Sequence, residues 1–136
     1  MTMTFDVLRL ANIARLPLFK NARGEVAHSQ PDGSDWKLSA WSNAVLGELG
    51  EAANLIKKIE RGDFTLDEKR NELGKELADV QVYLDILAYR ADVDLGEATK
   101  QKWNEVSRRV NCPLRLVKSP SGIEISSVAL DDDDGA

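Results

Sequence analysis

Apolar residues recur every three or four positions along most of this chain, which is the spacing of one face of an α-helix. The pattern predicts four helices, over residues 4–16, 36–60, 67–90 and 94–110. We find no internal repeat and no sign of a second core. The predicted fold class is therefore all-α, a bundle of four helices.

Capping residues and prolines mark the ends of these helices. Thr4 is placed to cap the first helix and either Asp35 or Ser34 the second. The segment "DLGE" (94–97) has the pattern of a capping box and opens the fourth helix. Pro17 ends the first helix, because proline lacks the backbone N–H that a helix interior requires.

After the fourth helix the pattern changes. "LRLV" (114–117) and "IEISSVAL" (123–130) flank the turn-forming segment "KSPSG", which predicts a small hairpin or an extended arm. We therefore expect a helical domain over residues 1–112, followed by a C-terminal arm and acidic tail over residues 113–136.

Composition excludes several classes of protein. The 136 residues carry a formal net charge of -5 and show no basic stripe, so we expect no nucleic acid partner. The one cysteine, Cys112, cannot form an intrachain disulfide and indicates a reducing, cytoplasmic compartment. We find no signal-peptide pattern and no run near the roughly 18 apolar residues of a membrane span, so we expect no membrane partner.

The second predicted helix is apolar over more than half of its circumference. Leu46, Leu49, Ala53 and Ile56 widen its stripe beyond what one neighbouring helix covers. We therefore expect a partner subunit, in a homodimer or a dimer of dimers.

Two glutamates interrupt this apolar stripe. At about 100° per residue, Glu48 falls inside the arc swept by Trp41, Ala52 and Leu55, and Glu51 falls at its edge. A buried carboxylate without a partner is strongly unfavourable, because it loses its hydration. The two glutamates therefore require a compensating partner.

The third predicted helix repeats the arrangement with Glu76 and Asp79, again spaced i, i+3. In an antiparallel hairpin the four carboxylates converge. Two carboxylates about 4–5 Å apart repel by roughly 3–4 kcal/mol at an effective dielectric constant near 20. A hard cation bound between the carboxylates replaces this repulsion with attraction, and Mg²⁺ prefers oxygen ligands, water and substrate phosphates. The pairs predict a Mg²⁺ site, with Mn²⁺ as a substitute.

Two other interpretations compete with a Mg²⁺ site. Most single E-x-x-E pairs on charged helices are solvated or form salt bridges. From geometry alone, that interpretation and the metal site are equally well supported. A di-iron carboxylate bundle needs E-x-x-H pairs. It is excluded, because the only histidine, His28, lies in the loop between the first two helices.

Two segments of the chain resemble a known family. "WSNAVLGELGEAANLIKKIERG" (41–62) and "KELADVQVYLDILAYRADVDLGEATKQKWNEVSRR" (75–109) are similar to the MazG-type, all-α nucleoside triphosphate pyrophosphohydrolases, a superfamily that includes dimeric dUTPases and dCTP pyrophosphatases. The similarity covers residues 36–109. Its specific part is the E-x-x-E … E-x-x-D pair, whose two halves are separated by 24 residues (52–75).

The resemblance implies a MazG-like four-helix bundle that acts on nucleoside triphosphates. It implies that one metal-bound water attacks the triphosphate, which releases a nucleoside monophosphate and pyrophosphate. The residues that the family pattern assigns to Mg²⁺ binding and catalysis are Glu48, Glu51, Glu76 and Asp79.

The resemblance also implies substrate contacts. Tyr83 is similar to a substrate-contacting tyrosine of the dCTP-hydrolysing members, and Lys102 stands where the family places a phosphate-binding lysine. Lys58, on the acidic side of its helix, is a second candidate for phosphate binding. Asn104 and Arg109 fall within the family's ligand-contacting region. For each of these residues, an ordinary core or solvated side chain is the competing interpretation.

The sequence departs from the dCTP-type pattern at two positions. Val106 replaces an asparagine, and Lys58 replaces a base-stacking tryptophan. The base specificity of that group therefore does not carry over. Trp36, Trp41 and His28 are candidates for a base pocket, although Trp41 also fits the apolar arc of the second helix.

These observations support two functions. The first is a Mg²⁺-dependent nucleotide pyrophosphohydrolase that controls nucleotide pools or removes non-standard nucleotides. The second is a non-catalytic helical dimerisation or adaptor module that keeps the same scaffold. The presence of all four acidic residues favours the enzyme, because a degenerate module is expected to lose at least one.

Overall fold

The computed structural model describes residues 2–28, 35–120 and 122–128, and these residues form the predicted order of elements. The helical elements are α1 (Phe5–Arg15), a short 3-10 turn η1 (Leu16–Leu18), α2 (Leu38–Glu60), α3 (Leu66–Arg90) and α4 (Leu95–Arg109). Strands β1 (Leu114–Ser119) and β2 (Gly122–Ser127) pair antiparallel. The prediction of a mostly helical fold with four α-helices and a small C-terminal hairpin is confirmed. Among the described helices, none is long and apolar enough to cross a membrane.

Local signals explain where most of the helices begin. Thr4 accepts a hydrogen bond from the backbone N–H of Val7 (3.1 Å), and Asp94 accepts one from the backbone N–H of Glu97 (2.9 Å). Both bonds satisfy donors that the first turn of a helix leaves unpaired. At the end of α1 the chain tightens into η1, which contains Pro17.

The cap predicted for the second helix is wrong. α2 begins at Leu38 with Lys37 at the N-cap position, and no side chain caps it. The carboxylate of Asp35 instead forms a salt bridge with Arg90 at the end of α3. Ser34, the alternative cap, lies outside the described residues.

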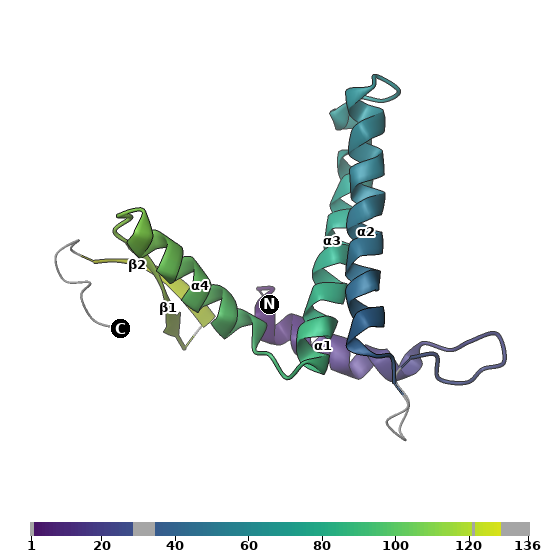
Figure 1. Cartoon of the computed structure of the whole chain (residues 1–136), viewed down its shortest axis with the longest axis horizontal. Coiled ribbons are helices and arrows are strands. Elements are labelled where there is room, and N and C mark those ends of the chain that lie inside the picture. The colour runs from purple at the N-terminus through teal and green to yellow at the C-terminus, as the bar shows by residue number, and fades with distance from the viewer. Residues whose placement is uncertain (1, 29–34, 121, 129–136) are drawn as a thin grey trace.

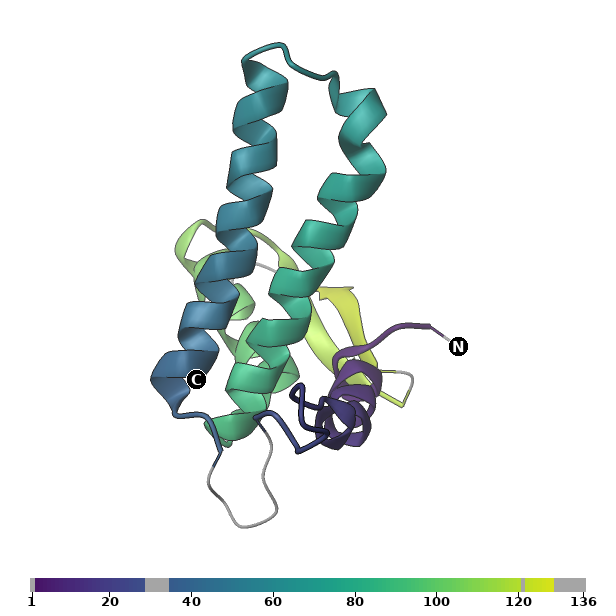
Figure 2. The ribbon, with the colours of Figure 1, turned by 90° about the vertical axis from the view of Figure 1, so that its right-hand side faces the viewer.

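The longest helices, α2 and α3, run antiparallel and side by side as a protruding hairpin (Figures 1 and 2). The turn between them includes Gly62, whose φ of 91° suits a residue without a side chain. α1 packs across the base of this hairpin against α3 (Figure 1). α4 packs against β1 of the strand hairpin and extends away from the α2–α3 hairpin (Figure 1).

The buried core lies at the base of the hairpin, where α1, η1, α2 and α3 meet. Its centre is formed by Leu16, Trp41 and Ile86, each less than 5% exposed. Tyr83 and Tyr89 pack against this centre among other partly buried residues. In the upper part of the hairpin, α2 and α3 pack only against each other among the described elements.

A buried carboxylate attaches α1 to α3. Asp85 is 1% exposed and accepts hydrogen bonds from Arg9 Nε (3.0 Å) and from Asn12 Nδ2 (2.9 Å). Arg9 also donates to the backbone oxygen of Val93 (3.0 Å). The buried charge is therefore both paired and hydrogen-bonded, as burial requires.

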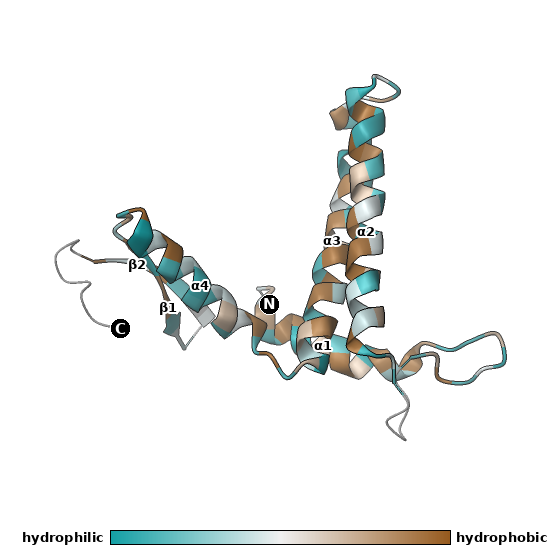
Figure 3. Ribbon diagram, in the orientation of Figure 1, coloured by the Kyte–Doolittle hydropathy of each residue, from teal (hydrophilic) through white to brown (hydrophobic). Residues whose placement is uncertain are grey.

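Much of the predicted apolar stripe is exposed in the single chain. Figure 3 shows hydrophobic residues recurring along α2 and α3. On α2, Leu46 is 64% and Leu49 is 48% exposed, and on α3 Leu77 is 49% exposed. Trp103 on α4 and Val110, which follows α4 directly, are also exposed. Packing of α2 against α3 alone therefore leaves part of the apolar stripe of α2 exposed, which agrees with the width of that stripe in the sequence.

Substitution of the buried carboxylate tests the attachment of α1. Asp85→Ala should lower the free energy of unfolding by about 3–5 kcal/mol, because it leaves Arg9 and Asn12 without their partner. The measurement is urea denaturation followed by circular dichroism. The control is Asp67→Ala, which removes a surface ion pair with Arg70 and should cost less than about 1 kcal/mol. Similar losses for the two variants would contradict a structural role for Asp85.

Candidate functional site

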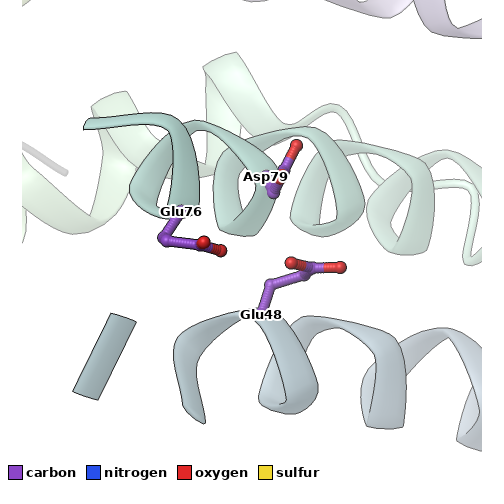
Figure 4. A group of neighbouring side chains, drawn as sticks. All are labelled: Glu48, Glu76 and Asp79. Atoms are coloured by element: carbon purple, nitrogen blue, oxygen red, sulfur yellow. The ribbon is translucent and has the colours of Figure 1, made fainter. Parts of the chain in front are cut away.

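Three of the four predicted carboxylates meet between the two long helices. Glu48 projects from α2, and Glu76 and Asp79 come from the facing side of α3 (Figure 4). Each offers an oxygen, and these oxygens lie within 4.8 Å of one another. The antiparallel packing of α2 and α3 therefore brings together three of the four carboxylates that we expected to converge.

The fourth carboxylate, Glu51, is not a member of this close group but acts on it electrostatically. Partial burial, followed by the charges of Glu51 and Asp79, raises the pKa of Glu48. Burial, followed by a hydrogen bond with Glu51 and its charge, raises the pKa of Glu76. In both cases burial is the main cause, and the like charges of the neighbouring carboxylates add to it.

The donor set fits a hard divalent cation. All four side chains are carboxylates, and none of the ion pairs in the described part of the chain involves them. Oxygen ligands on two helices suit Mg²⁺ or Mn²⁺, whereas zinc sites usually include nitrogen or sulfur. A cation would remove the repulsion that raises the two pKa values.

A cavity of about 260 Å³ opens beside the carboxylates. Glu48 and Asp79 form part of its wall, so the acidic group and the cavity are one continuous site. The remaining lining residues come from α1, η1, the loop after η1, α2 and α3, and they are Arg15, Leu16, Phe19, His28, Trp41, Val82, Tyr83 and Ile86.

Aromatic rings form much of the cavity wall. His28 lies 5.2 Å from Phe19, 4.9 Å from Trp36 and 5.0 Å from Trp41, measured between ring centroids. Trp41 lies 6.3 Å from Tyr83 in the same way. The three predicted base-pocket candidates are therefore neighbours, and Trp41 is both a core residue and part of the cavity wall.

Two buried polar atoms in this wall have no hydrogen-bond partner among the described residues, Nε1 of Trp41 and Nδ1 of His28. Such atoms are rare in native proteins and usually indicate a ligand or water. Burial and the nearby charge of Arg90 lower the pKa of His28, so its ring is neutral near pH 7. The wall therefore combines aromatic rings with two buried polar atoms that are unpaired among the described residues.

Tyr83 joins the acidic group to the cavity. Burial, followed by the charges of Glu48 and Asp79, raises its pKa, so the phenol stays protonated and can donate a hydrogen bond. The structure thus places this predicted substrate contact beside the carboxylates.

The other predicted substrate contacts lie outside the cavity wall of the single chain. Lys102 forms an exposed salt bridge with Glu105 (2.6 Å) on α4. Asn104 exchanges two hydrogen bonds with the backbone of Leu116 (2.9 and 2.8 Å), which attaches β1 to α4. Substrate roles for Lys102 and Asn104 stay predictions, as do those for Lys58 and Arg109.

Sequence analysis missed Arg15 and Phe19, which line the cavity from either side of η1. The Arg15 guanidinium lies 5.6 Å from the centroid of the Phe19 ring. The available signal was a cation and an aromatic residue four positions apart around Pro17. We had interpreted this segment only as the end of the first helix.

Comparison with known proteins gives one partial similarity. No protein-family model matches the chain, and no solved structure matches it. A segment of 74 residues is 36% identical to the Gene 37 protein of Mycobacterium phage L5. The segment covers 53% of this chain and 65% of the phage protein, so the match spans less than two thirds of that relative. Its name states no activity.

The raised pKa values predict how stability depends on pH. A carboxylate whose pKa is higher in the folded state stabilises the fold below its ordinary pKa, and this contribution is lost as pH rises through the folded value. Without metal, the contribution of Glu48 to stability should therefore be lost as pH rises above its ordinary pKa of about 4.5, and Glu48→Gln should keep that contribution and raise the melting temperature at pH 7 relative to the unaltered chain. The measurement is thermal melting with EDTA between pH 4 and pH 8.

A matched control separates this effect from a general loss of charge. Glu72 lies one turn before Glu76 and pairs with Lys69 (2.8 Å), so Glu72→Gln should leave stability unchanged or slightly lower at pH 7. A lower melting temperature for Glu48→Gln than for Glu72→Gln would show that Glu48 is a structural carboxylate.

Proposed function

We propose that this chain is a Mg²⁺-dependent nucleotide pyrophosphohydrolase with a MazG-like helical fold. It would convert a ribo- or deoxyribonucleoside triphosphate to the monophosphate and pyrophosphate, in nucleotide pool control or house-cleaning. The observation that carries the proposal is the continuity of the acidic group with an aromatic cavity that has two unpartnered buried polar atoms.

Each part of the site has a role in this proposal. Glu48, Glu76 and Asp79 would hold Mg²⁺, with Glu51 as a further ligand or a base for water. When bound, Mg²⁺ would polarise phosphoryl oxygens and lower the pKa of a coordinated water. The aromatic wall would hold the base, and the phenol of Tyr83 would donate a hydrogen bond to the sugar or phosphate.

Two observations support cleavage by water between the α- and β-phosphates. Among the described residues that line the cavity there is no cysteine, serine or threonine, and Cys112 lies beyond α4. The chain has no "GxxxxGK[ST]" loop to bind a terminal phosphate. The resemblance to MazG-type enzymes then favours a monophosphate and intact pyrophosphate as the products.

A non-catalytic adaptor module would need neither the cavity nor its unpartnered polar atoms. It would need only an exposed surface for its partner. The polar atoms of Trp41 and His28 are costly to leave unpaired, and a nucleotide gives a reason for their presence. We therefore prefer the enzyme over the adaptor.

The chain would act as a homo-oligomer, either a homodimer or a dimer of dimers. The support is the uncovered apolar face of the hairpin, which includes Leu46, Leu49 and Leu77. A second copy would cover this face and complete a helical bundle. It could also bring α4, with Lys102, toward a neighbouring acidic group.

The activity test uses all eight common ribo- and deoxyribonucleoside triphosphates. With Mg²⁺ and no added pyrophosphatase, ³¹P NMR should detect a monophosphate and pyrophosphate as the first products of at least one substrate. Excess EDTA should abolish turnover, and Mn²⁺ should restore it. A nucleoside diphosphate with orthophosphate would refute the assigned bond, and no turnover in the whole panel would refute the enzyme.

Substitution of a carboxylate tests the metal site. Asp79→Asn should lower kcat by at least about 100-fold without lowering apo stability, because it keeps the shape but removes a ligand charge. Asp67→Asn, on the same helix but outside the site, should keep full activity. Turnover of Asp79→Asn within a few fold of the unaltered protein would exclude Asp79 as a metal ligand.

The oligomer is tested by sedimentation. The unaltered chain should sediment as a dimer or tetramer at micromolar concentration, and Leu49→Asp should shift it toward monomer or unfold it. Glu60→Asp is a mild control on the same helix. A stable monomer of the unaltered chain would contradict the proposed assembly.

A further inference from the structure

The cavity has one permanently charged cation in its described wall. Arg15 lines it together with Glu48 and Asp79, while His28 is the other basic residue there and has a lowered pKa. Arg15 stands in the last turn of α1 and reaches this wall from outside the α2–α3 hairpin.

Arg15 is held without being neutralised. Its guanidinium lies 5.6 Å from the centroid of the Phe19 ring, which orients the planar group by a cation–π contact. None of the ion pairs found within residues 2–28, 35–120 and 122–128 includes it. Its hydrogen-bond donors therefore stay available to an anion.

The carboxylates create a need for such a cation. A triphosphate is repelled by the acidic group, and the metal alone faces both sets of negative charge. Arginine suits this role, because its planar donors match two oxygens of one phosphate. The charge of Arg15 already acts on this site: burial and the charges of Glu48 and Asp79 raise the pKa of Tyr83, and Arg15 partly opposes that rise.

We propose that Arg15 binds the triphosphate of the substrate, and that each protein chain supplies this cation to its own cavity. The inference rests on the proposed function and assigns a role that sequence analysis had given to Lys102 and Lys58. Neither lysine lines the cavity, and Lys102 is paired on the distant α4.

The test compares the binding of four kinds of ligand to the whole chain by isothermal titration calorimetry. The probes are the non-hydrolysable α,β-imido analogues of all eight common ribo- and deoxyribonucleoside triphosphates with Mg²⁺, the matching nucleosides, inorganic triphosphate, and Mg²⁺ alone. The variants are Arg15→Met, which keeps an apolar stem beside Phe19, and Arg15→Lys, which keeps the charge. The control is Arg23→Met, which removes an exposed arginine paired with Glu25.

Arg15→Met should weaken the best-binding analogue by about 10- to 100-fold, the effect expected for a charge-assisted hydrogen-bond pair. It should weaken inorganic triphosphate as well, and leave nucleoside and Mg²⁺ binding unchanged. Arg15→Lys should recover part of the affinity, and Arg23→Met should match the unaltered chain. Equal apo melting temperatures would confirm that each variant is folded.

Three results would overturn the inference. Analogue binding by Arg15→Met within two-fold of the unaltered chain would overturn it while leaving the proposed function intact. An equal loss of nucleoside binding would show that Arg15 contacts the base instead of the phosphates. Failure of the unaltered chain to bind any analogue would overturn both the inference and the proposed function.

Discussion

The antiparallel register of α2 and α3 is the constraint on which the candidate site depends. It sets Glu48 opposite Glu76 and Asp79, and a slip of one helical turn, about 5.4 Å, would separate them. Burial of the carboxylates, and after it the repulsion between their charges, works against this register and raises the pKa values of Glu48 and Glu76. The hairpin is therefore held by packing at its base and by its turn, and the acidic group is a local cost that the rest of the fold offsets.

Local sequence patterns predicted most of the secondary structure because the signals are short-range. The 3.6-residue period, Thr4 and Asp94 as caps, and the segment around the strand turn each depend on residues close in sequence. Asp85 could not be interpreted in the same way. Its partners Arg9 and Asn12 lie 76 and 73 positions away, so in the sequence it looks like an ordinary solvated aspartate on a charged helix.

The candidate site likewise has one part that local sequence patterns predict and one part that depends on residues distant in sequence. The i, i+3 spacing of the carboxylates identified a group on two helices, and the structure brings Glu48, Glu76 and Asp79 together. The cavity wall is different, because Arg15 and Phe19 reach it through a turn that follows a helix end. Only the docking of α1 reveals which side of that turn faces the carboxylates.

The separation between Arg9 and Asp85 also bears on how the chain folds. The hairpin of α2 and α3 joins neighbouring segments, so its closure costs little loop entropy. α1 is made earlier than either helix, yet its charged partner is 76 positions later in the chain. We infer that α1 docks last, and that the cavity wall closes only after the acidic group has already formed. Between these steps a folding molecule would hold its carboxylates on an open helical hairpin, with the aromatic wall unassembled.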